Sequence, residues 1–175
     1  MPRPTTRDGL PRRSIFNEKR RLADPINPSL IAKLRPVISY HGYAKHKANP
    51  HAYGLTGYSG RSGDRTLCDR HAHFLPNDMP TIPVLLQRAL SAGLVGHAWE
   101  SIGPRMMWTV ADSGWIFELK ETNPVQADYH GYPLLPGDPM AKLVYDRFAA
   151  AAISLGDQAL TLAAANCRAR YRLKT

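Results

Sequence analysis

Five of the seven histidines of this chain lie between residues 40 and 74, among tyrosine, glycine and basic residues. They are His41, His46, His51, His71 and His73. Histidine titrates near neutral pH, so a neutral and a protonated imidazole can serve together as general base and general acid. Lys45 and Arg65 could stabilise the negative charge that develops on a phosphate. These residue types fit metal-independent cleavage of RNA, although their spacing defines no single geometry.

A metal site is the weaker interpretation of the same segment. Cys68, His71 and His73 lie close together in the sequence, and zinc accepts Cys and His in tetrahedral sets. A fourth ligand would have to be His51 or His97. The segment contains no Cys-x-x-Cys pair, so no metal and no cofactor are expected.

The net charge of +9 is distributed unevenly along the chain. Residues 1–80 have a net charge of +8, residues 81–166 of −3 and residues 167–175 of +4. A basic surface favours polyanions because binding releases their counterions. The sequence therefore predicts a nucleic-acid partner, with contacts from Arg12, Arg13, Lys19, Arg20, Arg21, Lys45, Lys47, Arg61, Arg65 and Arg70.

The function expected from these patterns is nucleic-acid binding by the first half of the chain. One alternative is a metal-independent RNase, or another toxin-like enzyme acting on nucleotides. A second alternative is a protein-interaction module whose charge is incidental. Tyr40-His41-Gly42 resembles the His-Gly step of ADP-ribosyltransferases, but the rest of that family's pattern is missing and no role follows.

The helix and hairpin predicted over residues 81–132 should position these residues. Ile82, Leu85, Leu86, Ala89 and Leu90 recur at helical spacing. Gly93 fits the left-handed position that ends a helix, and Gly114 fits a short hairpin turn. Alternation over 106–111 and 115–120 predicts a half-buried strand pair, and residues 125–131 predict a third strand. Tyr129-His130-Gly131-Tyr132 repeats the tetrapeptide of residues 40–43, and the sequence offers no physical reason for this.

A helix that ends in Ala-Gly-Leu-Val and precedes a two-stranded ribbon resembles the second half of a winged-helix domain. Further helices are predicted after Asn27, after Asp138 and over residues 158–167. The core should combine Trp108, Trp115, Phe117, Leu85, Leu86, Leu143 and Phe148.

The chain is therefore expected to be an α+β protein with a loop-rich, basic N-terminal half. Residues 1–24 are predicted to be a flexible arm, residues 25–166 one domain and residues 167–175 a basic tail. Two distant cysteines favour a reducing, bacterial-type cytoplasm, and no apolar run is long enough to span a membrane. The oligomeric state cannot be derived from these patterns.

Overall fold

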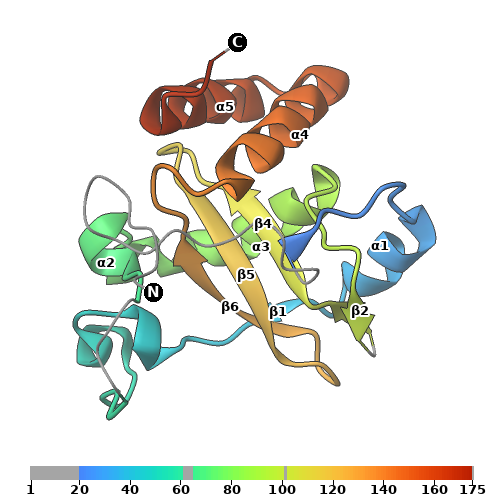
Figure 1. Ribbon diagram of the computed structural model, residues 1–175. Coiled ribbons are helices and arrows are strands. Elements are labelled where there is room, and N and C mark those ends of the chain that lie inside the picture. The colour runs from blue at the N-terminus through green and yellow to red at the C-terminus, as the bar shows by residue number, and fades with distance from the viewer. Residues whose placement is uncertain (1–19, 61–64, 101, 175) are drawn as a thin grey trace, which may run out of the picture.

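The computed structural model describes residues 20–60, 65–100 and 102–174 and has a mixed α+β architecture (Figure 1). The α-helices are α1 (Pro28–Leu34), α2 (Cys68–His71), α3 (Ile82–Ser91), α4 (Met140–Leu155) and α5 (Gln158–Tyr171), and the 3-10 helices are η2 (Ala44–His46), η3 (Pro50–Tyr53) and η4 (Pro76–Thr81). The strands are β1 (Ser39–Tyr40), β2 (Trp99–Glu100), β3 (Gly103–Pro104), β4 (Met106–Val110), β5 (Ile116–Asn123) and β6 (Asp128–Pro133). The prediction of an α+β fold is confirmed.

The main sheet has four strands in the order β1-β6-β5-β4, and β2 pairs separately with β3. β4, β5 and β6 form an antiparallel meander, whereas β1 joins β6 in parallel. In that parallel pair Tyr40 lies opposite Tyr129, so the two Tyr-His-Gly-Tyr segments begin side by side in the same register. The third predicted strand exists but begins at Asp128, because residues 124–127 form a turn.

The predicted helix and hairpin are both present. All five apolar residues of the helical stripe are buried in α3, and Gly93 has a φ of 63° at its end. Gly114 has a φ of 82° in the hairpin turn, where an added Cβ would lie 2.4 Å from the Asn166 carbonyl carbon. The prediction of a half-buried ribbon was wrong, because every residue of β4 is buried. Helices cover both faces of this part of the sheet.

The two faces of the sheet are buried by different segments. α1 and α3 pack with Met107, Leu119 and Tyr129 on one side. On the other side α4 and α5 pack with Trp108, Val110 and Ile116, and Figure 1 shows both helices above one end of the strands. The sheet therefore forms the middle layer of the molecule.

The C-terminal helices correct part of the predicted core. Phe148, Trp108 and Trp115 are buried as expected, but Leu143 is 48% exposed because it lies on the outer side of α4. Leu86 packs in the cluster beneath α3 and not with Trp108 and Trp115. Asp157 caps α5, which continues beyond the expected end at Cys167 to Tyr171. In the described part of the chain, no helix has both the length and the apolar character that crossing a bilayer requires.

Candidate functional site

A cluster of aromatic rings lies beside β6, where the chain between β1 and η2 turns away from the sheet. Tyr43 lies at its centre and is 41% exposed. Its ring contacts Tyr58 edge-on at a centroid distance of 6.5 Å and His130 at 4.9 Å. Three rings from separate segments therefore meet around one accessible tyrosine.

Three cationic side chains surround these rings. The Arg65 guanidinium lies 5.2 Å from the centroid of the Tyr58 ring, and Lys45 and Lys120 are close enough to His130 to act on its titration. Lys120 lies opposite His130 in the β5–β6 pairing. We call Tyr43, Lys45, Tyr58, Arg65, Lys120 and His130 together the aromatic–basic patch.

His130 of the patch stacks on a second buried histidine, His46. The rings of His46 and His130 lie 5.5 Å apart at an interplanar angle of 15°, and His46 also stacks on Tyr132 at 4.6 Å. His46 Nδ1 is 3.0 Å from the carbonyl oxygen of Thr66. A carbonyl can only accept, so this nitrogen carries a proton, and Nε2 is the basic nitrogen of a neutral His46.

His130 is held in its neutral form. Burial is the largest cause and lowers the pKa of His130 to about 4, with further lowering by His46, Lys120 and Lys45. Asp128 opposes the shift but does not cancel it. The imidazole is therefore neutral at physiological pH and can accept a proton, but a pKa this far below 7 makes it a weak base.

The segment that carries His46 is anchored to α2. The Asp69 carboxylate accepts hydrogen bonds from the backbone N–H groups of Ala48 and Asn49 at 2.8–3.0 Å. Burial by itself would raise the pKa of Asp69, but these donors outweigh it and lower the pKa. The loop between η2 and η3 is thereby fixed although it contains little regular structure.

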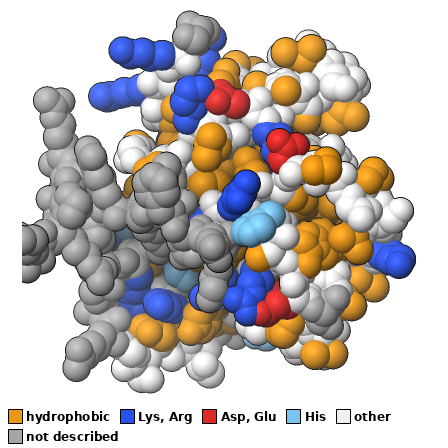
Figure 2. Space-filling view, turned by 45° about the vertical axis from the view of Figure 1, so that its right-hand side comes forward, with side chains coloured by type: hydrophobic (Ala, Val, Ile, Leu, Met, Phe, Trp, Pro, Cys, Tyr) orange, Lys and Arg blue, Asp and Glu red, His pale blue; other side chains and the backbone are white. Residues whose placement is uncertain are grey.

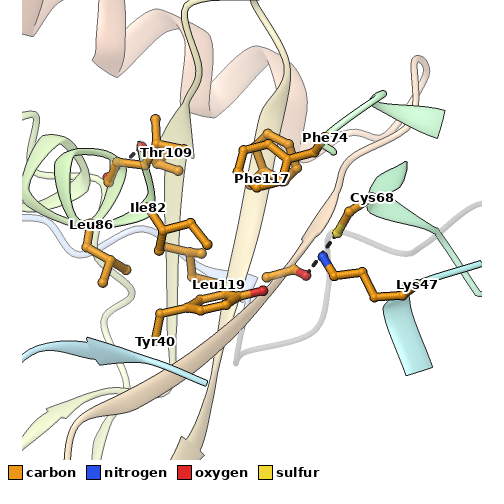
Figure 3. Close-up of a pocket in the computed structure, with 11 residues that line it drawn as sticks. Tyr40, Lys47, Cys68, Phe74, Ile82, Leu86, Thr109, Phe117 and Leu119 are labelled. Carbon is orange, nitrogen blue, oxygen red and sulfur yellow. Dashed lines mark hydrogen bonds between the residues drawn. The ribbon is translucent and has the colours of Figure 1, made fainter. Parts of the chain in front are cut away.

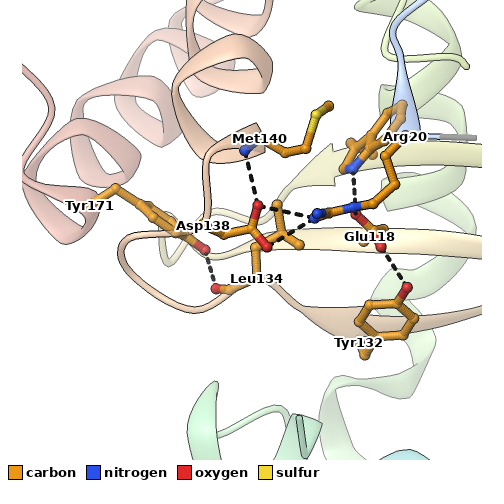
Figure 4. A network of polar contacts seen from close by, with 8 residues as sticks. Arg20, Glu118, Tyr132, Leu134, Asp138, Met140 and Tyr171 are labelled. Carbon is orange, nitrogen blue, oxygen red and sulfur yellow. Dashed lines mark hydrogen bonds and ion pairs between the residues drawn. The ribbon is translucent and has the colours of Figure 1, made fainter. Parts of the chain in front are cut away.

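On the α4 side of the sheet lies a buried ionic network (Figure 4). Arg20 pairs with Glu118 at 2.7 Å and with Asp138 at 2.9 Å. Glu118 also accepts from Trp108 Nε1 at 3.1 Å and from the Tyr132 hydroxyl at 2.5 Å. Arg20 was predicted to bind nucleic acid, but its side chain is only 6% exposed and is occupied by two carboxylates. It therefore links the N-terminal segment to the sheet and to α4.

Lys47 is buried on the opposite side of the sheet and is only 2% exposed. Figure 3 shows its ammonium beside Cys68, at the edge of a small, largely apolar cavity of about 30 Å³. The ammonium also lies 4.6 Å from the centroid of the Tyr53 ring. No carboxylate pairs with Lys47 among the described residues. Lys47 was predicted to contact nucleic acid, but its burial makes the side chain inaccessible to such a partner.

The other predicted residues do not converge on one site. His41, His51, His73, Arg21 and Arg70 are exposed at separate places. His71 Nδ1 lies within hydrogen-bond distance of the backbone of Leu67. Arg12, Arg13, Lys19 and Arg61 lie outside the described residues. Of the histidines predicted as site residues, only His46 is in ring contact with the aromatic–basic patch, through Tyr43 and His130.

The weak metal candidates do not form a ligand set. Cys68 donates to the Gly131 carbonyl at 3.4 Å, and His73 is exposed at the start of the segment that leads to η4. Within the part of the chain that is described, no three His, Cys, Asp or Glu side chains are grouped so that they could hold a metal ion.

Sequence reasoning missed His130 and Tyr43 as site residues. The repeated tetrapeptide was the available signal, since it contains both residues and its two copies meet in space. Figure 2 shows a face on which basic and acidic side chains lie next to one another among hydrophobic side chains, and on which Lys and Arg gather near the C-terminal end. The positive charge is therefore divided among several surfaces.

Comparisons of the chain with protein-family models, with curated proteins and with solved structures find no match.

Proposed function

We propose that the aromatic–basic patch binds single-stranded nucleic acid. Proteins that bind single strands combine aromatic side chains, on which bases stack, with cations that follow the phosphates. The exposed Tyr43 ring, in edge contact with Tyr58 and His130 and flanked by Lys45, Arg65 and Lys120, is the observation that carries the proposal. One base would stack on Tyr43 while neighbouring phosphates meet the cations.

A cytoplasmic location fits this proposal, because Cys68 and Cys167 are both buried free thiols.

The resemblance to a winged-helix domain does not supply a second surface for nucleic-acid binding. On the outer side of α3, Gln87 and Ser91 hydrogen-bond to Arg35 of α1 and are engaged within the fold.

The test measures the fluorescence anisotropy of labelled oligo-uridine and oligo-thymidine over a range of salt concentrations. Tyr43→Ala should weaken binding by the ~1–3 kcal/mol that one stacked base contributes, whereas Tyr43→Phe, which keeps the ring, should not. Each lost phosphate contact should reduce the log–log salt slope by about 0.7.

A charge-matched pair of variants separates the patch from net charge. Lys45→Ala with Lys120→Ala should reduce affinity and salt slope, whereas Lys33→Ala with Lys142→Ala, which removes the same charge from α1 and α4, should change both only slightly. Equal losses in the two double variants, or no binding at low salt, would favour the protein-interaction alternative.

RNA cleavage is a second candidate function, favoured by the stacked histidines. His130, neutral at pH 7, would take the proton of a 2′-hydroxyl, and His46 would protonate the leaving oxygen. DNA of the same sequence lacks the 2′-hydroxyl and should stay intact. Cleavage should persist with a chelator and fall by about 10²–10⁴-fold in His46→Ala. If the RNA stayed intact under all these conditions, nucleic-acid binding would remain as the proposed function without cleavage.

A further inference from the structure

A cleft of about 680 Å³ lies at the other end of the β4–β5 hairpin and shares no residue with the aromatic–basic patch. Its walls come from η4 and α3, from the hairpin turn and from the end of α5. Phe74, Val84 and Trp115 provide apolar wall. This volume lies in the range of pockets that hold small organic molecules.

Arg170 is held at the rim of the cleft in a fixed position. Its guanidinium lies 4.7 Å from the centroid of the Trp115 ring, and its Nε donates to the Ser113 carbonyl at 3.1 Å. Its two Nη atoms have no hydrogen-bond partner among residues 20–60, 65–100 and 102–174. A guanidinium fixed in this way offers two parallel donors to a carboxylate, sulfonate or phosphate.

The second arginine of the cleft is already neutralised. Arg88 pairs with Asp112 at 2.8 Å and donates to the Val110 carbonyl. Asp78 is engaged as well, because its carboxylate accepts from the backbone N–H of Leu75. Arg170 is therefore the cation of the cleft that lacks a carboxylate partner within the described chain.

The backbone at the cleft is also unusual at one position. His73, which lines the cleft, has a φ of 50°, a left-handed conformation that costs a non-glycine residue free energy. The following residue, Phe74, packs edge-on against Phe117 at 5.3 Å and thereby fixes the wall beside His73. Such conformations are frequent at ligand-binding sites.

We propose that this cleft binds a small amphipathic acid, with its oxyanion on Arg170 and its apolar body against Phe74, Val84 and Trp115. The proposal does not rest on nucleic-acid binding at the patch. Apolar walls alone would accept a neutral molecule equally well, so the unpaired guanidinium is what selects an acid.

The test uses two dyes with the same ring system. 8-Anilinonaphthalene-1-sulfonate carries an oxyanion, and N-phenyl-1-naphthylamine lacks it. The sulfonate should bind saturably to the full chain and about tenfold more tightly than the neutral dye, as expected for a partly exposed charge-assisted contact. Equal affinity for the two dyes would overturn the proposed role of Arg170.

Matched variants locate the binding. Arg170→Met removes the charge but keeps an alkyl chain over Trp115, and it should abolish the preference for the sulfonate. Arg168→Met removes the same charge from α5 outside the cleft and should retain it. Amide NMR shifts on dye addition should include Ala111 and Ser113. Equal loss in both arginine variants, or shifts confined to other regions, would refute the site.

Discussion

Two buried cations lie on opposite sides of the sheet, and their surroundings differ. Arg20 meets Glu118 and Asp138, and these two carboxylates outweigh the effect of burial and raise its pKa. Lys47 meets a thiol, aromatic rings and an apolar cavity, with no carboxylate partner in the described residues. Burying a charge is costly unless it is paired, so the Arg20 centre holds segments together, whereas the Lys47 centre is expected to reduce stability.

The largest effect should come from breaking the Arg20 centre. Glu118→Gln removes the charge that pairs with Arg20 Nε and leaves the buried guanidinium with Asp138 as its one carboxylate partner among the described residues. We expect the free energy of unfolding in urea to fall by about 3–5 kcal/mol. The triple variant Arg20→Met/Glu118→Gln/Asp138→Asn removes all three charges of the network, keeps side-chain oxygens that can accept from Trp108 and Tyr132, and should recover much of this loss. A triple variant as unstable as Glu118→Gln would show that packing, and not charge, sets the cost.

His130 is another buried ionisable group, and it avoids the cost by staying neutral. Its pKa is about 4 in the folded chain against an ordinary value of 6.5. Between these values the unfolded chain binds a proton that the folded chain does not. Stability should therefore fall as pH decreases from about 6.5 to about 4, by at most ~3 kcal/mol.

Urea unfolding at each pH would measure this dependence. His130→Gln should remove this part of the pH dependence, whereas His51→Gln, at an exposed position, should leave it in place. A wild-type curve that is flat between pH 6.5 and 4 would contradict the depressed pKa.

Sequence patterns predicted the local elements of this fold but not its two charged centres. α3 and the hairpin follow from spacing and from Gly93 and Gly114, which act over a few residues. Glu118 occupies a strand position that alternation assigned to a half-buried ribbon, and its partner Arg20 lies 98 residues away. Nothing local distinguishes such a pair from surface charges.

The candidate site was predictable only in part, for the same reason. His46 could be chosen by residue type, and Lys45 and Arg65 by charge. Their meeting with Tyr43 and His130 depends on the parallel β1–β6 pairing, a contact between segments almost ninety residues apart. Leu143 was predicted to be in the core but is exposed. Its spacing places it in the apolar stripe of α4, but spacing does not show how much of that stripe the neighbouring segments cover.

Removing the cation of the second centre should act in the opposite direction. Lys47→Met keeps an unbranched side chain of similar volume but removes the buried ammonium that lies over the Tyr53 and Phe74 rings. We expect the free energy of unfolding to rise by about 1–2 kcal/mol, as when buried charges are replaced by apolar groups. Thermal unfolding, with Lys33→Met as an exposed control, would measure it. Destabilisation by Lys47→Met would mean that the contact with Cys68 or the rings compensates the charge.

The smallest effect should come from a polar contact outside both centres. Asp157 accepts hydrogen bonds from the N–H groups of Ala159 and Leu160 at the start of α5, where its side chain is exposed. Asp157→Ala should lower the free energy of unfolding by about 1 kcal/mol, and Asp157→Ser, which can still cap the helix, by less. Asp157 and Glu118 are both carboxylate acceptors, but Asp157 is exposed and accepts from backbone amides, whereas Glu118 is buried and accepts from a charged guanidinium. If Asp157→Ala lowered the free energy of unfolding as much as Glu118→Gln, burial would not explain why the Glu118 contact is costly to lose. If Asp157→Ala cost several times less, the larger cost of Glu118→Gln would be assigned to the buried Arg20 guanidinium, which loses one of its two carboxylate partners.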